Sequence, residues 1–156
     1  MLSKWDVRFL KLAEFYASFS KDPSTKVGAV IIDPKTHIEL GSGYNGFPRG
    51  VCDYPERYAD RETKYKFVVH AEVNACINTN GNGNLTGGTL YIYPTLSIPA
   101  VCSECAKIVI QCGIKRVVFW DTPVSDRWQA SAEISRIMFT EAGVKMSAIP
   151  FQKSTT

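Results

Sequence analysis

Apolar residues recur at helical spacing in several stretches of the chain, with charged residues between them. Between residues 4 and 20, aromatic and leucine side chains lie three or four positions apart, which predicts an amphipathic helix with its aromatic stripe in the core. Further helices are predicted over residues 70–77, 103–112 and 129–142. Gly113 follows the helix predicted at residues 103–112, and glycine is common directly after a helix end.

Shorter apolar runs between these helices are typical of strands. We expect strands at residues 27–32, 38–44, 89–93, 116–120 and 144–149. The first two flank residues 33–36, whose turn chemistry predicts a hairpin. Because strands and helices alternate after this hairpin, the pattern predicts an α/β fold with helices on both faces of the sheet, which makes three layers.

Residues 45–63 combine glycine and proline with polar and aromatic residues, and we interpret them as a long irregular loop. Long loops in compact domains are usually functional, so this one is expected to shape a pocket. A polar, glycine-rich turn follows at residues 79–88. A chain of 156 residues without internal repeats is expected to form a single domain over residues 1–156.

Composition and charge narrow the class of ligand. The formal net charge is +3, and the basic residues are scattered between acids, which favours a small anionic ligand over a long nucleic acid. No leader or long apolar run is evident, so we expect a soluble, cytoplasmic protein without a membrane partner. Five cysteines, an odd number, argue against a disulfide framework and favour metal ligation in a reducing compartment.

Two short motifs carry the candidate chemistry. His70 and Glu72 stand two positions apart at the start of one predicted helix, and Cys102 and Cys105 stand three apart at the start of another. Cysteines at that spacing share one helix face, and the positive end of a helix favours their thiolate form. With His70 they offer three ligands, the number typical of a catalytic zinc site that keeps a position for water.

Glu72 is better suited to acid and base work than to ligation, because a carboxylate beside such a water can take its proton and return it elsewhere. The other histidine, His37, lies in the predicted hairpin turn, and neither it nor Trp128, near a predicted helix start, is expected to have a catalytic part. Cys76 and Cys112 are expected to be small core residues. A redox role for the cysteine pair is the rival interpretation, but no thioredoxin-like βαβ pattern surrounds it.

The chain resembles the deoxycytidylate (dCMP) deaminases over residues 5–149. The resemblance rests on the segments SKDPSTKVGA at 20–29, GYNGFPRG at 43–50, TKYKFVVHAEVNA at 63–75 and CAKIVIQCGIK at 105–115. It implies a cytidine-deaminase-like, five-stranded mixed sheet between helices, a catalytic zinc ion, and often a hexamer switched by deoxynucleoside triphosphates. The implied effectors are dCTP and dTTP with Mg²⁺.

The resemblance also implies the reaction, which is zinc-dependent hydrolysis of dCMP to dUMP and ammonia. Asn45 resembles the family's substrate-contacting asparagine, although it also suits a left-handed turn position between glycines. We expect Ala71 to contact the substrate as well. Because the substrate carries a phosphate, Lys26 and Arg49 are candidates for binding it.

The sequence departs from the family pattern at one point. The family usually has proline directly before the first cysteine of the pair, whereas here two residues separate Pro99 from Cys102, and residues 93–98 look lengthened. Some phage members carry a second zinc ion, but only Cys52 suggests itself as an additional ligand, so we expect one ion per chain.

Two other functions stay open on the sequence. The first is deamination of a related substrate, which is dCTP, cytidine, guanine or adenosine in transfer RNA. The second is the role of a zinc-binding regulatory module without catalysis. A transfer-RNA editor is expected to have a more basic surface, and a purely structural site gains nothing from Glu72.

Overall fold

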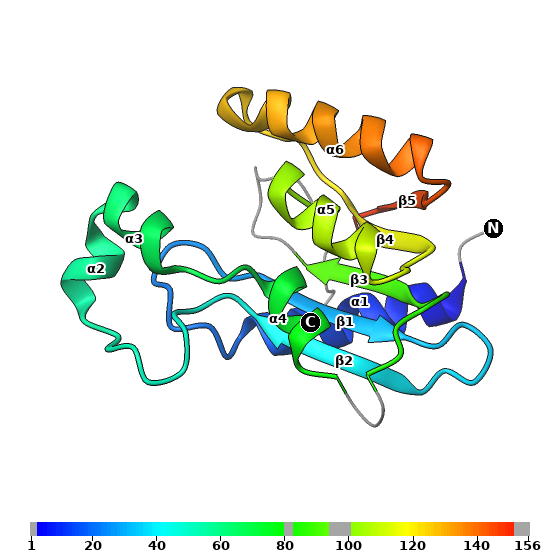
Figure 1. The fold of residues 1–156 in the computed structure, drawn as a ribbon, viewed down its shortest axis with the longest axis horizontal. Coiled ribbons are helices and arrows are strands. Elements are labelled where there is room, and N and C mark those ends of the chain that lie inside the picture. Colours follow the sequence, from blue (N-terminus) through cyan, green and yellow to red (C-terminus); the bar gives the residue numbers. More distant parts are fainter. Residues whose placement is uncertain (1–2, 80–82, 94–100, 152–156) are drawn as a thin grey trace.

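A computed structural model of the chain describes residues 3–79, 83–93 and 101–151. Its centre is a five-stranded sheet in the order β2-β1-β3-β4-β5 (Figure 1). The strands are β1 Gly28–Ile32, β2 Glu39–Tyr44, β3 Thr89–Tyr93, β4 Arg116–Asp121 and β5 Lys145–Pro150. Strand β1 is antiparallel to both of its neighbours, while β3, β4 and β5 are parallel. The predicted α/β fold with a five-stranded mixed sheet and an opening hairpin is therefore confirmed.

The helices predicted from periodicity are present with small changes at their ends. The helical elements are α1 Lys4–Ala17, α2 Pro55–Ala59, α3 Arg61–Phe67, α4 Ala71–Ile77, α5 Ser103–Gln111, the 3₁₀ turn η1 Asp126–Trp128 and α6 Gln129–Glu141. Cys112 is the C-cap of α5, and Gly113 follows with a φ of 80°, the left-handed conformation that glycine adopts without steric cost.

Each face of the sheet has its own apolar core. In β1, Ala29 and Ile31 join the core beneath α4, α5 and α6, whereas Val30 and Ile32 join the core beneath α1. This division follows from the alternation of side chains along a strand. Figure 1 shows α1 behind the sheet and the other three helices on the opposite side. The predicted coverage of both faces is confirmed.

The aromatic stripe predicted for residues 4–20 is less buried than expected, and the helix itself ends at Ala17. Phe9 lies in the core, but Phe15 and Phe19 are exposed to solvent by 58% and 47%. The buried residues of α1 also include Leu10, Ala13 and Ala17, and small alanines stand at 13 and 17, where the helix backbone approaches Gly28 of β1. A Cβ atom on Gly28 would stand 1.9 Å from the carbonyl oxygen of Ala13.

A similar close approach fixes α4 on β2. A Cβ atom on Gly43 would lie 2.6 Å from the backbone nitrogen of Ala75, so only glycine allows this packing distance. The amide of Asn74 also donates a hydrogen bond to the carbonyl oxygen of Tyr44 at 2.8 Å. The start of α4, with His70 and Glu72, is therefore held at a defined place above the sheet.

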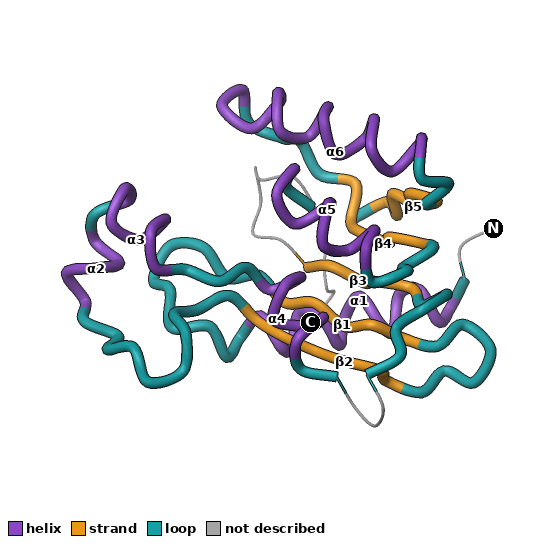
Figure 2. Tube along the Cα trace, viewed as in Figure 1, coloured by secondary structure: helices purple, strands orange, loops and turns teal. Residues whose placement is uncertain are grey.

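Residues 45–63, predicted as an irregular loop, contain α2 and the start of α3. The prediction was wrong because proline and aspartate, which commonly mark loops, here begin helices. Pro55 occupies the first turn of α2, and the Asp60 carboxylate accepts a hydrogen bond from the backbone nitrogen of Thr63 at 2.9 Å, which caps α3. Figure 2 shows long loop segments leading to this helix pair, which lies beyond one end of the sheet.

Candidate active site

Three potential metal ligands converge at the starts of α4 and α5. His70 is the N-cap of α4, Cys102 is the N-cap of α5, and Cys105 lies in the first turn of α5. The Nδ1 atom of His70 is 3.2 Å from the Cys105 sulfur and 3.4 Å from the Cys102 sulfur. All three ligand atoms lie within 4.8 Å of one another. Two motifs 32 residues apart thus meet at one point.

These distances suit a zinc ion. Zn–S bonds of about 2.3 Å and Zn–N bonds of about 2.0 Å in a tetrahedron separate sulfur and nitrogen ligands by about 3.5 Å. Among the described residues, no further histidine, cysteine or carboxylate belongs to this cluster, which leaves three protein ligands as in catalytic zinc sites. Cys52, the candidate for a second site, is exposed and apart from the cluster.

The two thiols differ in their protonation. A hydrogen bond from Cys105 lowers the pKa of Cys102 to about 4, and a further hydrogen bond from His70 acts in the same direction. The pKa of Cys105 is raised, because its proton is held by that hydrogen bond and the site is buried. Without metal, Cys102 is therefore the thiolate of the pair. Zinc binding releases the proton of Cys105, since both sulfurs must be thiolates to bind the ion.

Glu72 lies beside this cluster, in the first turn of α4, and its side chain is buried. Burial raises the pKa of its carboxyl to about 7, while the nearby charge of His70 opposes this rise. A cation on the three ligands would lower that pKa, because positive charge favours the carboxylate. A carboxyl group with these properties is suited to taking up and releasing a proton near neutral pH.

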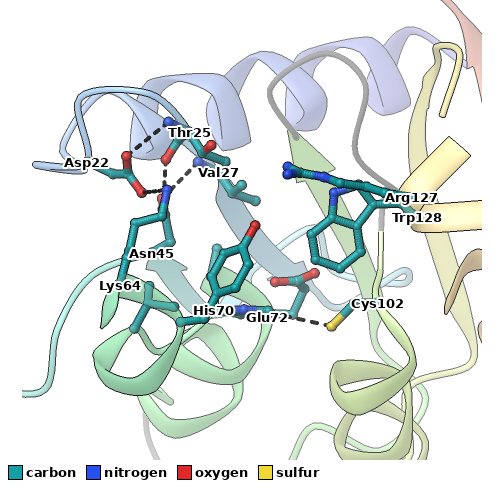
Figure 3. A pocket seen from close by; sticks show the side chains of 13 residues that line it. Asp22, Thr25, Val27, Asn45, Lys64, His70, Glu72, Cys102, Arg127 and Trp128 are labelled. Atoms are coloured by element: carbon teal, nitrogen blue, oxygen red, sulfur yellow. Dashed lines mark hydrogen bonds and ion pairs between the residues drawn. The ribbon is translucent and has the colours of Figure 1, made fainter. Parts of the chain in front are cut away.

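Glu72 and His70 lie at the floor of a pocket that opens to solvent (Figure 3). Cys102 and Ala71 also line it. Figure 3 shows Asn45, Lys64 and Asp22 along one wall and Arg127 and Trp128 along the opposite wall. The predicted residues at positions 45, 70, 71, 72 and 102 therefore share one pocket.

Asn45 is buried in the first wall, and its side chain is used structurally. Its amide oxygen accepts a hydrogen bond from the backbone nitrogen of Val27 at 2.9 Å, and its amide nitrogen donates to the carbonyl oxygen of Thr25 at 2.8 Å. The alternative, that Asn45 occupies a left-handed turn position, is wrong. Among the described residues other than glycine, only His37 has a positive φ. One amide hydrogen of Asn45 stays available for a ligand.

Lys64 and Asp22 complete this wall and had no predicted role. The Lys64 ammonium lies 3.0 Å from the Asp22 carboxylate, and their side chains are only 7% and 2% exposed. Asp22 also accepts hydrogen bonds from the backbone nitrogens of Ser24 and Thr25. Both residues fall within segments that carry the family resemblance, but nothing in their spacing indicated that α3 would meet the segment before β1.

The opposite wall was missed. Trp128, expected from the sequence to have no catalytic part, lines the pocket together with Arg127. Both residues belong to η1, between β4 and α6. The ring of Trp128 meets the ring of Tyr65 with a centroid distance of 6.3 Å. A polar and aromatic segment directly after a buried parallel strand was the available signal, because such strand ends commonly border a site.

The structure does not bring Lys26 or Arg49 into the lining of this pocket. The ammonium of Lys26 donates a hydrogen bond to the carbonyl oxygen of Ser20. The guanidinium group of Arg49 donates to the side chain of Asn78 at 2.6 Å on the exposed surface. The departure near Pro99 and the lengthened stretch after Tyr93 fall largely in residues 94–100, outside the described residues.

Comparison with known proteins agrees with this geometry. The family model of the cytidine and deoxycytidylate deaminase zinc-binding region matches residues 3–121. The deoxycytidylate deaminase of Mus musculus is 40% identical over 150 residues, which cover 90% of this chain and 77% of that protein. An uncharacterized deaminase of Aliivibrio fischeri is 37% identical, with 96% of this chain and 97% of that protein covered.

Solved structures share the fold. The apo crystal structure of the dCMP deaminase of cyanophage S-TIM5 has a TM-score of 0.68 at 25% identity and covers 96% of this chain and 100% of that chain. In the described part of the chain, no helix has the length and apolarity needed to span a bilayer. On the family model, the relatives and the convergence of His70, Cys102 and Cys105, the chain belongs to the cytidine and deoxycytidylate deaminase family of zinc-binding hydrolytic enzymes.

Proposed function

We propose that this protein is a zinc-dependent dCMP deaminase, which hydrolyses dCMP to dUMP and ammonia and so supplies dUMP for thymidylate synthesis. The observation that carries the proposal is the meeting of His70, Cys102 and Cys105 beside the buried carboxyl of Glu72 at the floor of a pocket. The substrate is inferred from relatives named deoxycytidylate deaminase, which are 38–40% identical over 90% of the chain.

In this proposal His70, Cys102 and Cys105 hold the ion, and the remaining work belongs to Glu72. When bound, zinc supplies the Lewis acidity that makes a water molecule nucleophilic near neutral pH. Glu72 takes a proton from that water and delivers it to N3 of the cytosine ring as a C–O bond forms at C4. Glu72 then takes the proton of the new C4 hydroxyl and passes it to the exocyclic amine, so that the C4–N bond breaks and ammonia leaves.

Two further residues position the substrate in this proposal. Asn45 donates its remaining amide hydrogen to the sugar of the nucleotide, and its hold on Thr25 and Val27 keeps that wall in place. Ala71 stands between His70 and Glu72 in the sequence and is fully buried. Its small side chain leaves room for the cytosine base against the pocket floor.

The finer properties rest on the family resemblance. We propose a cytoplasmic homo-oligomer, a hexamer by resemblance, with dCTP and dTTP in the presence of Mg²⁺ as its effectors. One zinc ion per chain is expected, since the described residues offer one cluster of three ligands. A small nucleotide rather than a long nucleic acid is the expected partner, because the net charge is only +3.

Ammonia release from a panel of substrates tests this function. Zinc-loaded protein is assayed with dCMP, dCTP, CMP, deoxycytidine and cytidine, each with and without added dCTP or dTTP and Mg²⁺. The proposal expects dCMP to have the highest kcat/KM. Highest turnover of another compound would reassign the substrate, and zinc binding without turnover of any cytosine compound would favour a regulatory module.

A further inference from the structure

The pocket has a wall that the deamination chemistry does not use. Arg127 and Trp128 line it from η1, a segment 55 residues beyond Glu72 in the chain. Figure 3 shows both side chains facing the wall of Asn45 and Lys64 across the pocket, with Glu72 and His70 at the floor between them.

The indole nitrogen of Trp128 is buried. Among the described residues, it is the only buried side-chain nitrogen or oxygen atom that has no hydrogen-bond partner. Buried polar groups in folded proteins are nearly always paired, and each exception calls for an explanation. An indole N–H can only donate, so the group that completes it must be an acceptor. Because Trp128 lines the pocket, a bound ligand is the natural source of that acceptor.

Arg127 supplies positive charge at the same wall. The other cationic side chain that lines the pocket and carries a permanent charge is Lys64, which is paired with Asp22 at 3.0 Å. Arg127 enters none of the salt bridges among the described residues. Its guanidinium carbon lies 5.5 Å from the centroid of the Trp128 ring, so the cation and the unpaired N–H group are neighbours. A guanidinium group beside an N–H donor is well suited to a phosphate.

We propose that Arg127 and Trp128 bind the 5′-phosphate of the substrate nucleotide, Arg127 through its guanidinium group and Trp128 through its indole N–H. The inference rests on the proposed function and assigns the phosphate contact to η1 instead of Lys26 or Arg49. It makes η1 the element by which the enzyme prefers a nucleoside monophosphate to a nucleoside. Tyr65, whose ring meets Trp128, steadies the orientation of the indole.

The test compares a phosphorylated and an unphosphorylated substrate. Zinc-loaded wild type, Arg127→Gln and Trp128→Phe are assayed with dCMP and with deoxycytidine. A charge-assisted hydrogen bond predicts that Arg127→Gln lowers kcat/KM for dCMP about 10- to 100-fold, mainly through KM, and leaves deoxycytidine within about 2-fold. Trp128→Phe keeps an aromatic ring without the donor and is expected to lower kcat/KM for dCMP about 5-fold, again without effect on deoxycytidine.

Matched controls separate the phosphate contact from general effects. Arg136→Gln removes an arginine from the exposed surface of α6, where it pairs with Glu133, and Trp5→Phe changes a tryptophan of α1. Both control variants are expected to leave kcat/KM unchanged for dCMP and for deoxycytidine. Equal losses on dCMP and deoxycytidine in Arg127→Gln, or no loss on dCMP, would overturn the inference.

A binding measurement keeps the inference testable if turnover fails. Calorimetric titration of dCMP and deoxycytidine into Glu72→Gln protein, with and without Arg127→Gln, measures the phosphate contact without the reaction. A loss of at least 10-fold in dCMP affinity, with deoxycytidine unaffected, supports the contact even if wild type releases no ammonia from dCMP, which would be a failure of the proposed function alone. Unchanged dCMP affinity rejects the contact whatever the activity.

Discussion

The floor and the walls of the pocket differ in how the chain builds them. At the floor, His70 and Glu72 are two positions apart on α4, and Cys102 and Cys105 are three apart on α5. One wall instead joins separate segments, as where Lys64 of α3 pairs with Asp22 before β1, and the opposite wall comes from η1, far along the chain from the first. The chemistry of the floor is therefore encoded in local spacing, whereas the shape that selects a substrate depends on contacts between distant parts of the chain.

The largest effect is expected at the floor. Replacing Glu72 by Gln keeps the size of the side chain and the three ligands but removes the group that carries protons. We expect kcat for dCMP to fall by about 10⁴-fold, the upper range for a proton-transferring side chain, with zinc still bound at one ion per chain. Steady-state kinetics and metal analysis of the same sample measure both. Near-normal turnover in this variant would remove Glu72 from the mechanism.

At the wall of Lys64 and Asp22, we expect substitutions to lower the stability of the protein more than the rate of the reaction. Lys64→Met leaves the Asp22 carboxylate buried without its cation, and breaking a buried ion pair costs about 3 kcal/mol of unfolding free energy. Urea unfolding of the zinc-loaded protein measures this loss.

The double variant Asp22→Asn/Lys64→Met serves as the control for this wall. It removes both charges and keeps an oxygen that accepts the hydrogen bonds from Ser24 and Thr25. Most of the stability is expected to return, because neutral replacements of a buried pair are often tolerated. A stability of Lys64→Met within about 0.5 kcal/mol of wild type would show that the pair is not a structural element of the wall.

The same contrast explains what the sequence could predict. The strand Thr89–Tyr93 and the two ligand motifs follow from runs and spacings within a few residues. The chemistry of the motifs predicted that His70 would meet Cys102 and Cys105, and the structure shows this contact. Helices α2 and α3 were missed because proline and aspartate are common both in loops and at helix starts, where Pro55 and Asp60 lie. Local pattern alone does not separate the two uses.

The walls were beyond prediction for another physical reason. Lys26 and Arg49 are cationic residues like Arg127, and only the tertiary fold decides which of them lies at the pocket. Trp128 gained its place through the packing of η1 near Tyr65, which lies 63 residues earlier. Asn45 was expected at the pocket, but its hydrogen bonds to Thr25 and Val27, 20 and 18 residues away, had no signal in spacing.

A smaller effect concerns acid. Burial of the Asp22 carboxyl raises its pKa, but the hydrogen bonds from Ser24 and Thr25 and the charge of Lys64 outweigh burial and lower that pKa below 3.8. A carboxyl group with a lowered folded-state pKa contributes stability above its unfolded pKa and loses it as pH falls through the folded value. The unfolding free energy of wild type is therefore expected to fall more steeply below about pH 4 than that of Asp22→Asn/Lys64→Met. Urea unfolding at pH 3 to 6 measures the difference, and parallel curves would rule out this role of Asp22.

The smallest effect is expected at Arg49, and it sharpens the contrast between a cation near a motif and a cation at the pocket. Arg49 belongs to the segment GYNGFPRG that carries the family resemblance, yet its side chain is exposed and bonds to Asn78. An exposed hydrogen bond of this kind contributes little, so Arg49→Gln should change the unfolding free energy by less than about 0.5 kcal/mol and KM for dCMP by less than about 2-fold. The measurement uses the dCMP and deoxycytidine assays applied to Arg127→Gln. A rise in KM for dCMP but not for deoxycytidine would move the phosphate from η1 to the segment after β2, because only a lost phosphate contact distinguishes these two substrates.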